Sequence, residues 1–143
     1  MSDDIPIWQW NAATIADATR TEKVSATEVV EAAITRMEDV NPALNAVVES
    51  LADEARAEAA ALDASDGPKG ALHGVPVTIK INVDQKGHAT TNGVAALKDV
   101  IASEDAPIER FSLYSSNVIA LIIEACCAIA SRVNKADMGE IGG

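Results

Sequence analysis

The sequence predicts an α/β fold in which helices form the first half of the chain and strands of a mixed sheet follow. Three observations support it. A helix start signal at Ser25–Glu28 precedes apolar residues at helical spacing. A β-branched run, Val75–Ile79, is bounded by glycine and carries a proline near its start. Between them, Ser65–Gly70 is the strongest turn signal in the chain.

The 143 residues suffice for one domain with one hydrophobic core. We expect a single, incomplete domain over residues 1–143, because neither half alone offers a convincing core. Residues 1–65 are predicted to be mainly helical. Residues 70–143 are predicted to run strand, loop, helix, strand.

The first half contains three predicted helices. The first is short, from Thr14 to about Lys23. In the second, Ser25 caps the first turn and Glu28 caps back, and an apolar stripe follows at Val30, Ala33, Ile34 and Met37. This helix is predicted to end before Asn41–Pro42, because a residue before proline disfavours the helical region.

The third predicted helix spans Leu51 to Ala64 and is rich in alanine. Its narrow apolar stripe at Ala55, Ala59 and Leu62 suits close packing against another element. The segment between the second and third helices, Leu44–Val48, is compatible with either a strand or a connector.

The second half opens with the strand Val75–Ile79, which ends at Lys80. Residues 89–107 show no clean period, and a loop of this length in a compact domain is usually functional or poorly ordered. A buried helix is predicted at Val118–Ala125, and a second buried strand at Cys127–Ala130. A right-handed crossover would place the two strands parallel in one sheet.

Composition excludes several classes of partner. The formal net charge of -11 argues against nucleic acid and against anionic membrane surfaces, since both require a basic patch. The N-terminus lacks a basic region followed by an apolar one. The most apolar run, Val118–Ala130, is interrupted by Glu124 and is shorter than the roughly 20 residues that span a bilayer. We expect a cytoplasmic protein without a nucleic-acid or membrane partner.

The two cysteines do not indicate a metal site. Cys126 and Cys127 are adjacent, a spacing at which disulfides rarely form, and two residues are too few for a metal cage. They are better interpreted as small buried hydrophobes in a reducing compartment. The sequence indicates neither a metal nor a cofactor.

Lys80 is the candidate functional residue. An unpaired ammonium is expensive to bury, so a lysine that ends an apolar strand is unusual. Sites in parallel sheets lie at the carboxyl ends of strands, and a desolvated lysine there can act as a base. Alternatively, Lys80 is an edge lysine whose stem carries the amine to solvent. Position alone favours this second interpretation.

Several spaced segments change that balance, because they resemble the amidase signature family of serine hydrolases. The strand motif is Leu72-His73-Gly74-Val75-Pro76, with the family's catalytic lysine matching Lys80, and the loop motif is Thr90-Thr91-Asn92-Gly93. Ser25–Val48 is similar to the family's N-terminal helix and the turn after it. Ala102–Pro107 and Glu124–Asn134 resemble later segments, so the likeness covers nearly the whole chain.

The resemblance implies hydrolysis of carbon–nitrogen bonds in small-molecule amides, with Lys80 as the base. In that family the lysine works with two serines, one of which lies in a cis peptide and relays a proton to or from the nucleophile. The glycine- and serine-rich segment that carries both serines lies beyond the matched region. The chain also has Ile81 where the family usually has an aspartate, and residues 108–116 match poorly.

No other residue replaces the missing serines. Ser115–Ser116 lacks glycine neighbours and is better interpreted as a helix cap, and Ser131 as a hydroxyl bonded to backbone. His73 and His88 have no acidic residue in a triad-like context and receive no catalytic role.

Two main hypotheses about function follow from the sequence. In the first, the chain is the N-terminal part of an amidase whose catalytic serines lie outside it. In the second, it is a truncated non-catalytic homologue or pseudoenzyme that acts as a binding or structural module. Either form would expose apolar surface and could self-associate. The residues do not identify which amide is the substrate.

Overall fold

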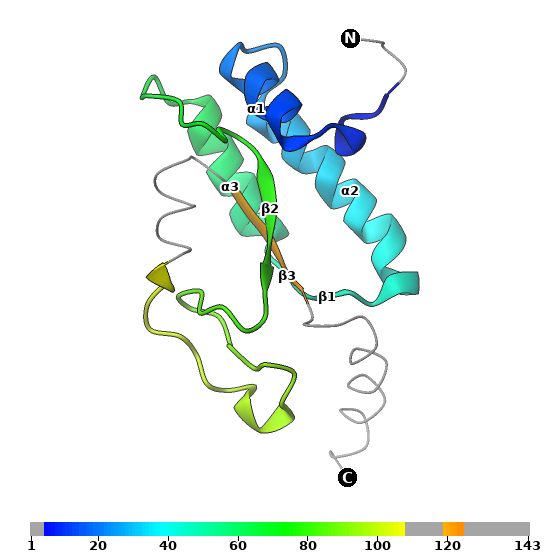
Figure 1. Cartoon of the computed structure of the whole chain (residues 1–143), viewed down its shortest axis with the longest axis vertical. Coiled ribbons are helices and arrows are strands. Elements are labelled where there is room, and N and C mark those ends of the chain that lie inside the picture. The colour runs from blue at the N-terminus through cyan, green and yellow to red at the C-terminus, as the bar shows by residue number, and fades with distance from the viewer. Residues whose placement is uncertain (1–4, 108–118, 125–143) are drawn as a thin grey trace.

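The computed structural model describes residues 5–107 and 119–124 (Figure 1). The helices are α1 (Ala12–Arg20), α2 (Ala26–Leu44) and α3 (Ala52–Asp63). The strands are β1 (Val47–Ser50), β2 (Pro76–Lys80) and β3 (Ile119–Glu124), and short 3-10 helices lie at Ile7–Gln9 and Ala95–Leu97. Helices therefore precede most of the sheet, as the sequence predicts.

The start of α2 is the best predicted local feature. The Ser25 side chain accepts a hydrogen bond from the Glu28 backbone N–H at 3.0 Å. The Glu28 carboxylate accepts one from the Ser25 N–H at 2.8 Å. This reciprocal capping box confirms the sequence interpretation, because both partners lie within one turn of each other.

The predicted end of α2 is wrong. The helix continues through Pro42 to Leu44, and Asn45 ends it in a left-handed conformation with φ 51°. The Asn41 side chain accepts hydrogen bonds from the backbone N–H groups of Ala46 and Val47, at 3.0 and 2.9 Å. These bonds join the last turn of α2 to β1. They stabilise the helical conformation of Asn41, which the following proline disfavours.

The other two helices confirm the prediction with small shifts at their ends. α1 begins two residues before the expected Thr14, because the Asn11 side chain accepts a hydrogen bond from the Thr14 N–H at 2.9 Å and caps the helix. α3 lies within the predicted Leu51–Ala64. The undecided segment Leu44–Val48 divides: Leu44 ends α2, and Val47 and Val48 begin the strand β1.

The three strands form a mixed sheet in the order β1-β3-β2. β3 runs antiparallel to β1 and parallel to β2, and its residues Ile119 and Ile123 are register partners of Pro76 and Ile79. The apolar run Val118–Ala125 predicts a helix here, and that prediction is wrong. A short apolar run has no distinguishing period, so the hydrogen-bonding neighbours on both sides decide its structure.

The predicted strand Cys127–Ala130 lies outside the described residues, as do Ser115, Ser116 and Ser131. The parallel partner of β2 in the described part of the chain is therefore Ile119–Glu124. The expected parallel arrangement exists, but an earlier segment provides it.

The main core lies where α2 and α3 pack on each other and on the start of β3. Its six members are each no more than 1% exposed: Ala26, Val30, Ile34, Ala55, Ala59 and Ile119. Two of them are the alanines of the predicted narrow stripe on α3. Small side chains at this contact let the two helices approach closely, as the alanine-rich composition indicates.

Of the helices that the structure describes, none combines the length and the apolar character needed to cross a membrane.

Candidate functional site

Lys80 is the last residue of β2, at the carboxyl end of a strand that pairs in parallel with β3. Its side chain is exposed, whereas the preceding Ile79 is 7% exposed. Among residues 5–107, no side chain forms a hydrogen bond or ion pair with the Lys80 ammonium. The amine thus reaches the surface of the described part, where a group from outside it could approach.

The residue after Lys80 packs into a small apolar cluster. Ile81 is 8% exposed and lies with Leu51 and Ile79, and Val83 packs against them. The position where the amidase signature family usually has an aspartate therefore serves as an apolar anchor for the end of β2. The Val83 N–H donates to the Lys80 carbonyl at 2.8 Å and closes the turn that follows.

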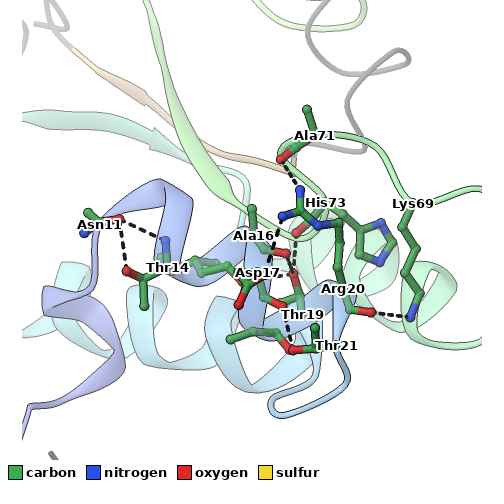
Figure 2. Close-up of polar contacts among 12 residues, drawn as sticks. Asn11, Thr14, Ala16, Asp17, Thr19, Arg20, Thr21, Lys69, Ala71 and His73 are labelled. Atoms are coloured by element: carbon green, nitrogen blue, oxygen red, sulfur yellow. Dashed lines mark hydrogen bonds and ion pairs between the residues drawn. The ribbon is translucent and has the colours of Figure 1, made fainter. Parts of the chain in front are cut away.

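The segment leading into β2 is held by the C-terminal end of α1 (Figure 2). The Arg20 guanidinium donates to the Ala71 carbonyl at 2.9 Å, and the Thr19 hydroxyl lies 2.5 Å from the His73 carbonyl. Lys69 forms a 2.8 Å ion pair with Glu22. These contacts join residues about 50 positions apart and fix the approach of the chain to the strand that ends at Lys80.

Gly74 completes this junction. Its φ is +72°, a left-handed conformation that glycine adopts without strain. A Cβ at this position would lie 3.1 Å from Thr19 Cγ2 and 3.2 Å from Ala26 Cβ. The backbone therefore passes against α1 and α2 at a distance that leaves no room for a side chain.

Asp63, at the end of α3, caps the N-terminus of α2 from outside the helix. Its carboxylate accepts hydrogen bonds from the backbone N–H groups of Ala26 and Thr27, at 2.7 and 3.0 Å, and from the Thr27 hydroxyl at 2.6 Å. Two backbone donors that α2 cannot satisfy internally thus find a charged partner.

These contacts predict an acid-sensitive contribution to stability. Partial burial opposes ionisation of Asp63, but the hydrogen bonds from Thr27 and Ala26 outweigh it and hold the pKa of Asp63 below its usual value of 3.8. Because the folded pKa is depressed, the stabilisation is complete above pH 3.8 and is lost as the pH falls through the lower folded pKa. We expect Asp63→Asn to lower the free energy of unfolding at pH 7 by about 1 kcal/mol, a typical capping contribution.

Urea denaturation at pH 7 and below pH 3 would test this prediction. The wild-type chain and Asp63→Asn should differ at pH 7 and converge in acid. Asp66→Asn, in the exposed turn three residues later, is the matched control and should resemble the wild type throughout. A difference that persists at low pH would show that Asp63 acts through its shape rather than its charge.

The two histidines occupy different environments. His73 is 5% exposed, and its Nδ1 is buried without a hydrogen-bond partner among the described residues. The His88 side chain is 18% exposed, and its Nδ1 lies 2.8 Å from Oε1 of Glu49. No acidic residue near His88 in the sequence predicts this contact. The partner lies 39 positions away on β1, and no local pattern signals it.

The long loop after β2 is an ordered arm, residues 84–106. Backbone hydrogen bonds join its two sides, from Gly87 to Ala102 and from Ala102 to His88, both at 2.9 Å. At its tip, Asn92 and Gly93 have φ of 50° and 76°, and the Val94 N–H donates to the Thr91 carbonyl at 2.8 Å. Two successive left-handed residues are typical of a type I′ turn, which Asn-Gly favours.

Comparison with known proteins places these features in a family. The family model described as Amidase matches residues 28–111. The chain is 53% identical over 108 residues to an indoleacetamide hydrolase of Bradyrhizobium diazoefficiens, covering 73% of this chain and 21% of that protein. It is 43% identical over 103 residues to a putative amidase AmiC of Mycobacterium tuberculosis, covering 72% and 21%.

Solved structures agree with this assignment. A bacterial aryl acylamidase of the amidase signature family superposes with a TM-score of 0.77 at 32% identity, over 85% of this chain and 26% of that one. A 6-aminohexanoate cyclic dimer hydrolase superposes with a TM-score of 0.71 at 27% identity, over 85% and 24%. The chain spans about a fifth of the length of the curated relatives it matches. By sequence and by fold, this chain belongs to the amidase signature family.

Proposed function

We propose that this chain contributes the general base of an amide-hydrolysing site, and that Lys80 is that base. The observation that carries the proposal is the place of Lys80, at the carboxyl end of a parallel strand with its side chain exposed. Sites in α/β folds form at such strand ends. The relative at 53% identity is an indoleacetamide hydrolase, so a primary amide of an aryl-substituted acetic acid is the substrate class we favour.

The chemistry requires groups that lie outside the described residues. A serine hydroxyl attacks the amide carbonyl carbon and loses its proton, through a second serine, to the neutral Lys80 amine. The proton then passes to the leaving nitrogen, which departs as ammonia, and water releases the acid from the serine. A lysine can accept this proton only while its amine is uncharged, so the approaching segment must also desolvate Lys80.

Complementation would test the proposal. The chain would be co-expressed with the part of the Bradyrhizobium indoleacetamide hydrolase that follows the matched region, and ammonia release from indole-3-acetamide would be measured. We expect activity in the mixture and in neither part alone. Lys80→Met should reduce that activity by about 100-fold or more, the contribution typical of a positioned base.

Lys98→Met is the matched control, because Lys98 is an exposed lysine on the arm after β2. It should leave activity within about twofold of the unsubstituted mixture, a change of less than 0.5 kcal/mol. Equal losses in the two variants, or full activity in Lys80→Met, would contradict the role of Lys80. If the two polypeptides bind each other without hydrolysis, the non-catalytic binding module becomes the better description.

Exposed apolar side chains support a partner surface on the arm. Val94, Val100 and Ile101 are 48%, 55% and 55% exposed. In the absence of a complementing polypeptide we expect these residues to promote self-association, which sedimentation at increasing concentration would detect.

A further inference from the structure

The arm that follows β2 contacts β1, the strand on the far side of the sheet. The strand order is β1-β3-β2, so β1 and β2 lie on opposite sides of β3. Adjacent strands are about 4.8 Å apart, which separates β1 from β2 by roughly 10 Å. The arm leaves the end of β2 (Figure 1), yet its His88 contacts Glu49 on β1. The side chains of this pair therefore bridge the width of β3, from the arm to β1.

Register fixes where this contact lies along the sheet. Glu49 is the register partner of Ile123 on β3, and Ile123 is the register partner of Ile79 on β2. The contact is thus at the row of the sheet immediately before Lys80. This row begins at Glu49 on β1 and ends at Ile79 on β2, the strand that also carries the candidate base.

The pair lies at hydrogen-bonding distance. Nδ1 of His88 and Oε1 of Glu49 are 2.8 Å apart. Because an ionised carboxylate only accepts, the bond forms with the tautomer that carries a proton on Nδ1. The His88 side chain is 18% exposed and that of Glu49 is 44% exposed. On the arm, the Gly87 N–H donates to the Ala102 carbonyl, and the Ala102 N–H donates to the His88 carbonyl. These two hydrogen bonds hold the backbone that carries the imidazole.

We propose that Glu49 and His88 are positioning residues that form a latch. Their hydrogen bond ties the arm, residues 84–106, to β1 and fixes Thr90–Gly93 relative to Lys80. The latch itself is a property of this chain, whereas its consequence for Lys80 rests on the proposed function. A test on the chain without a complementing polypeptide therefore separates failure of the latch from failure of the proposed function.

Amide hydrogen exchange in the full chain would test the latch. Glu49→Ala and His88→Ala should each raise the exchange rates of the Gly87 and Ala102 amides by about fivefold, with no change at the Ile34 amide in α2. The double variant should exchange no faster than either single variant, because both remove the same bond. Additive increases would overturn the proposal.

Two further variants separate the hydrogen bond from general effects. Glu49→Gln keeps an acceptor oxygen for the His88 N–H and should restore exchange to within about twofold of the wild-type chain. Glu31→Ala removes a carboxylate that pairs with Arg56 between α2 and α3, and it should leave the arm unchanged. Wild-type exchange in Glu49→Ala, or a rise spread evenly over the whole chain, would overturn the latch.

Discussion

Replacing Gly74 by alanine is expected to lower the free energy of unfolding by about 2–5 kcal/mol. Two effects add. A non-glycine residue in the left-handed region costs roughly 1–2 kcal/mol, and the new methyl would press on Thr19 and Ala26 at 3.1–3.2 Å, an overpacking that costs about 1–3 kcal/mol. Neither neighbour can move away easily, because Thr19 is buried on α1 and Ala26 begins α2.

Gly87 provides a control that also has a positive φ but has different surroundings. Its φ is +89°, and a Cβ there would meet no atom within 4 Å. Gly87→Ala should therefore show only the conformational part, about 1–2 kcal/mol. Urea denaturation of both variants, monitored by circular dichroism, isolates the packing part as their difference. Equal destabilisation of the two variants would show that the contacts of the new methyl group at position 74 add nothing to the loss in the free energy of unfolding.

Shortening Ile34 to alanine is the second large effect, with an expected loss of about 2–5 kcal/mol in the free energy of unfolding. Ile34 is 1% exposed and lies in the core that joins α2, α3 and the start of β3. Truncation would leave a cavity in this closely packed cluster, in which Ala26, Ala55 and Ala59 have no longer side chains to fill it. Because small domains are stable by about 5–15 kcal/mol in total, this one change would remove much of the margin.

A graded series tests this mechanism. Ile34→Val removes one methyl group and should cost about 0.5–1.5 kcal/mol. Val48→Ala, on a side chain that is 51% exposed, should change stability by less than about 0.5 kcal/mol. Thermal unfolding followed by calorimetry would rank the three variants. If Val48→Ala lowered the free energy of unfolding as much as Ile34→Ala, burial of Ile34 would not explain its effect.

The candidate site could be predicted from the sequence only in part. The strand that ends at Lys80 is confirmed, since its β-branched residues and flanking turn signals lie within a few positions of one another. The surroundings of that lysine could not be predicted. The hydrogen bonds from the end of α1 to the segment before β2 join residues about 50 positions apart. The Glu49–His88 pair joins residues 39 positions apart. Such contacts leave no periodic signal in the chain.

Features that depend on near neighbours follow from the local sequence: the capping box of α2, the alanine stripe of α3, and the strand that presents Lys80. Tertiary structure decided the rest. The run Ile119–Glu124 became a strand because β1 and β2 offer backbone partners on both sides. α2 passed Pro42 because Asn41 is bonded to the start of β1. In both cases, hydrogen bonds to distant residues outweigh the small preferences of the local chain.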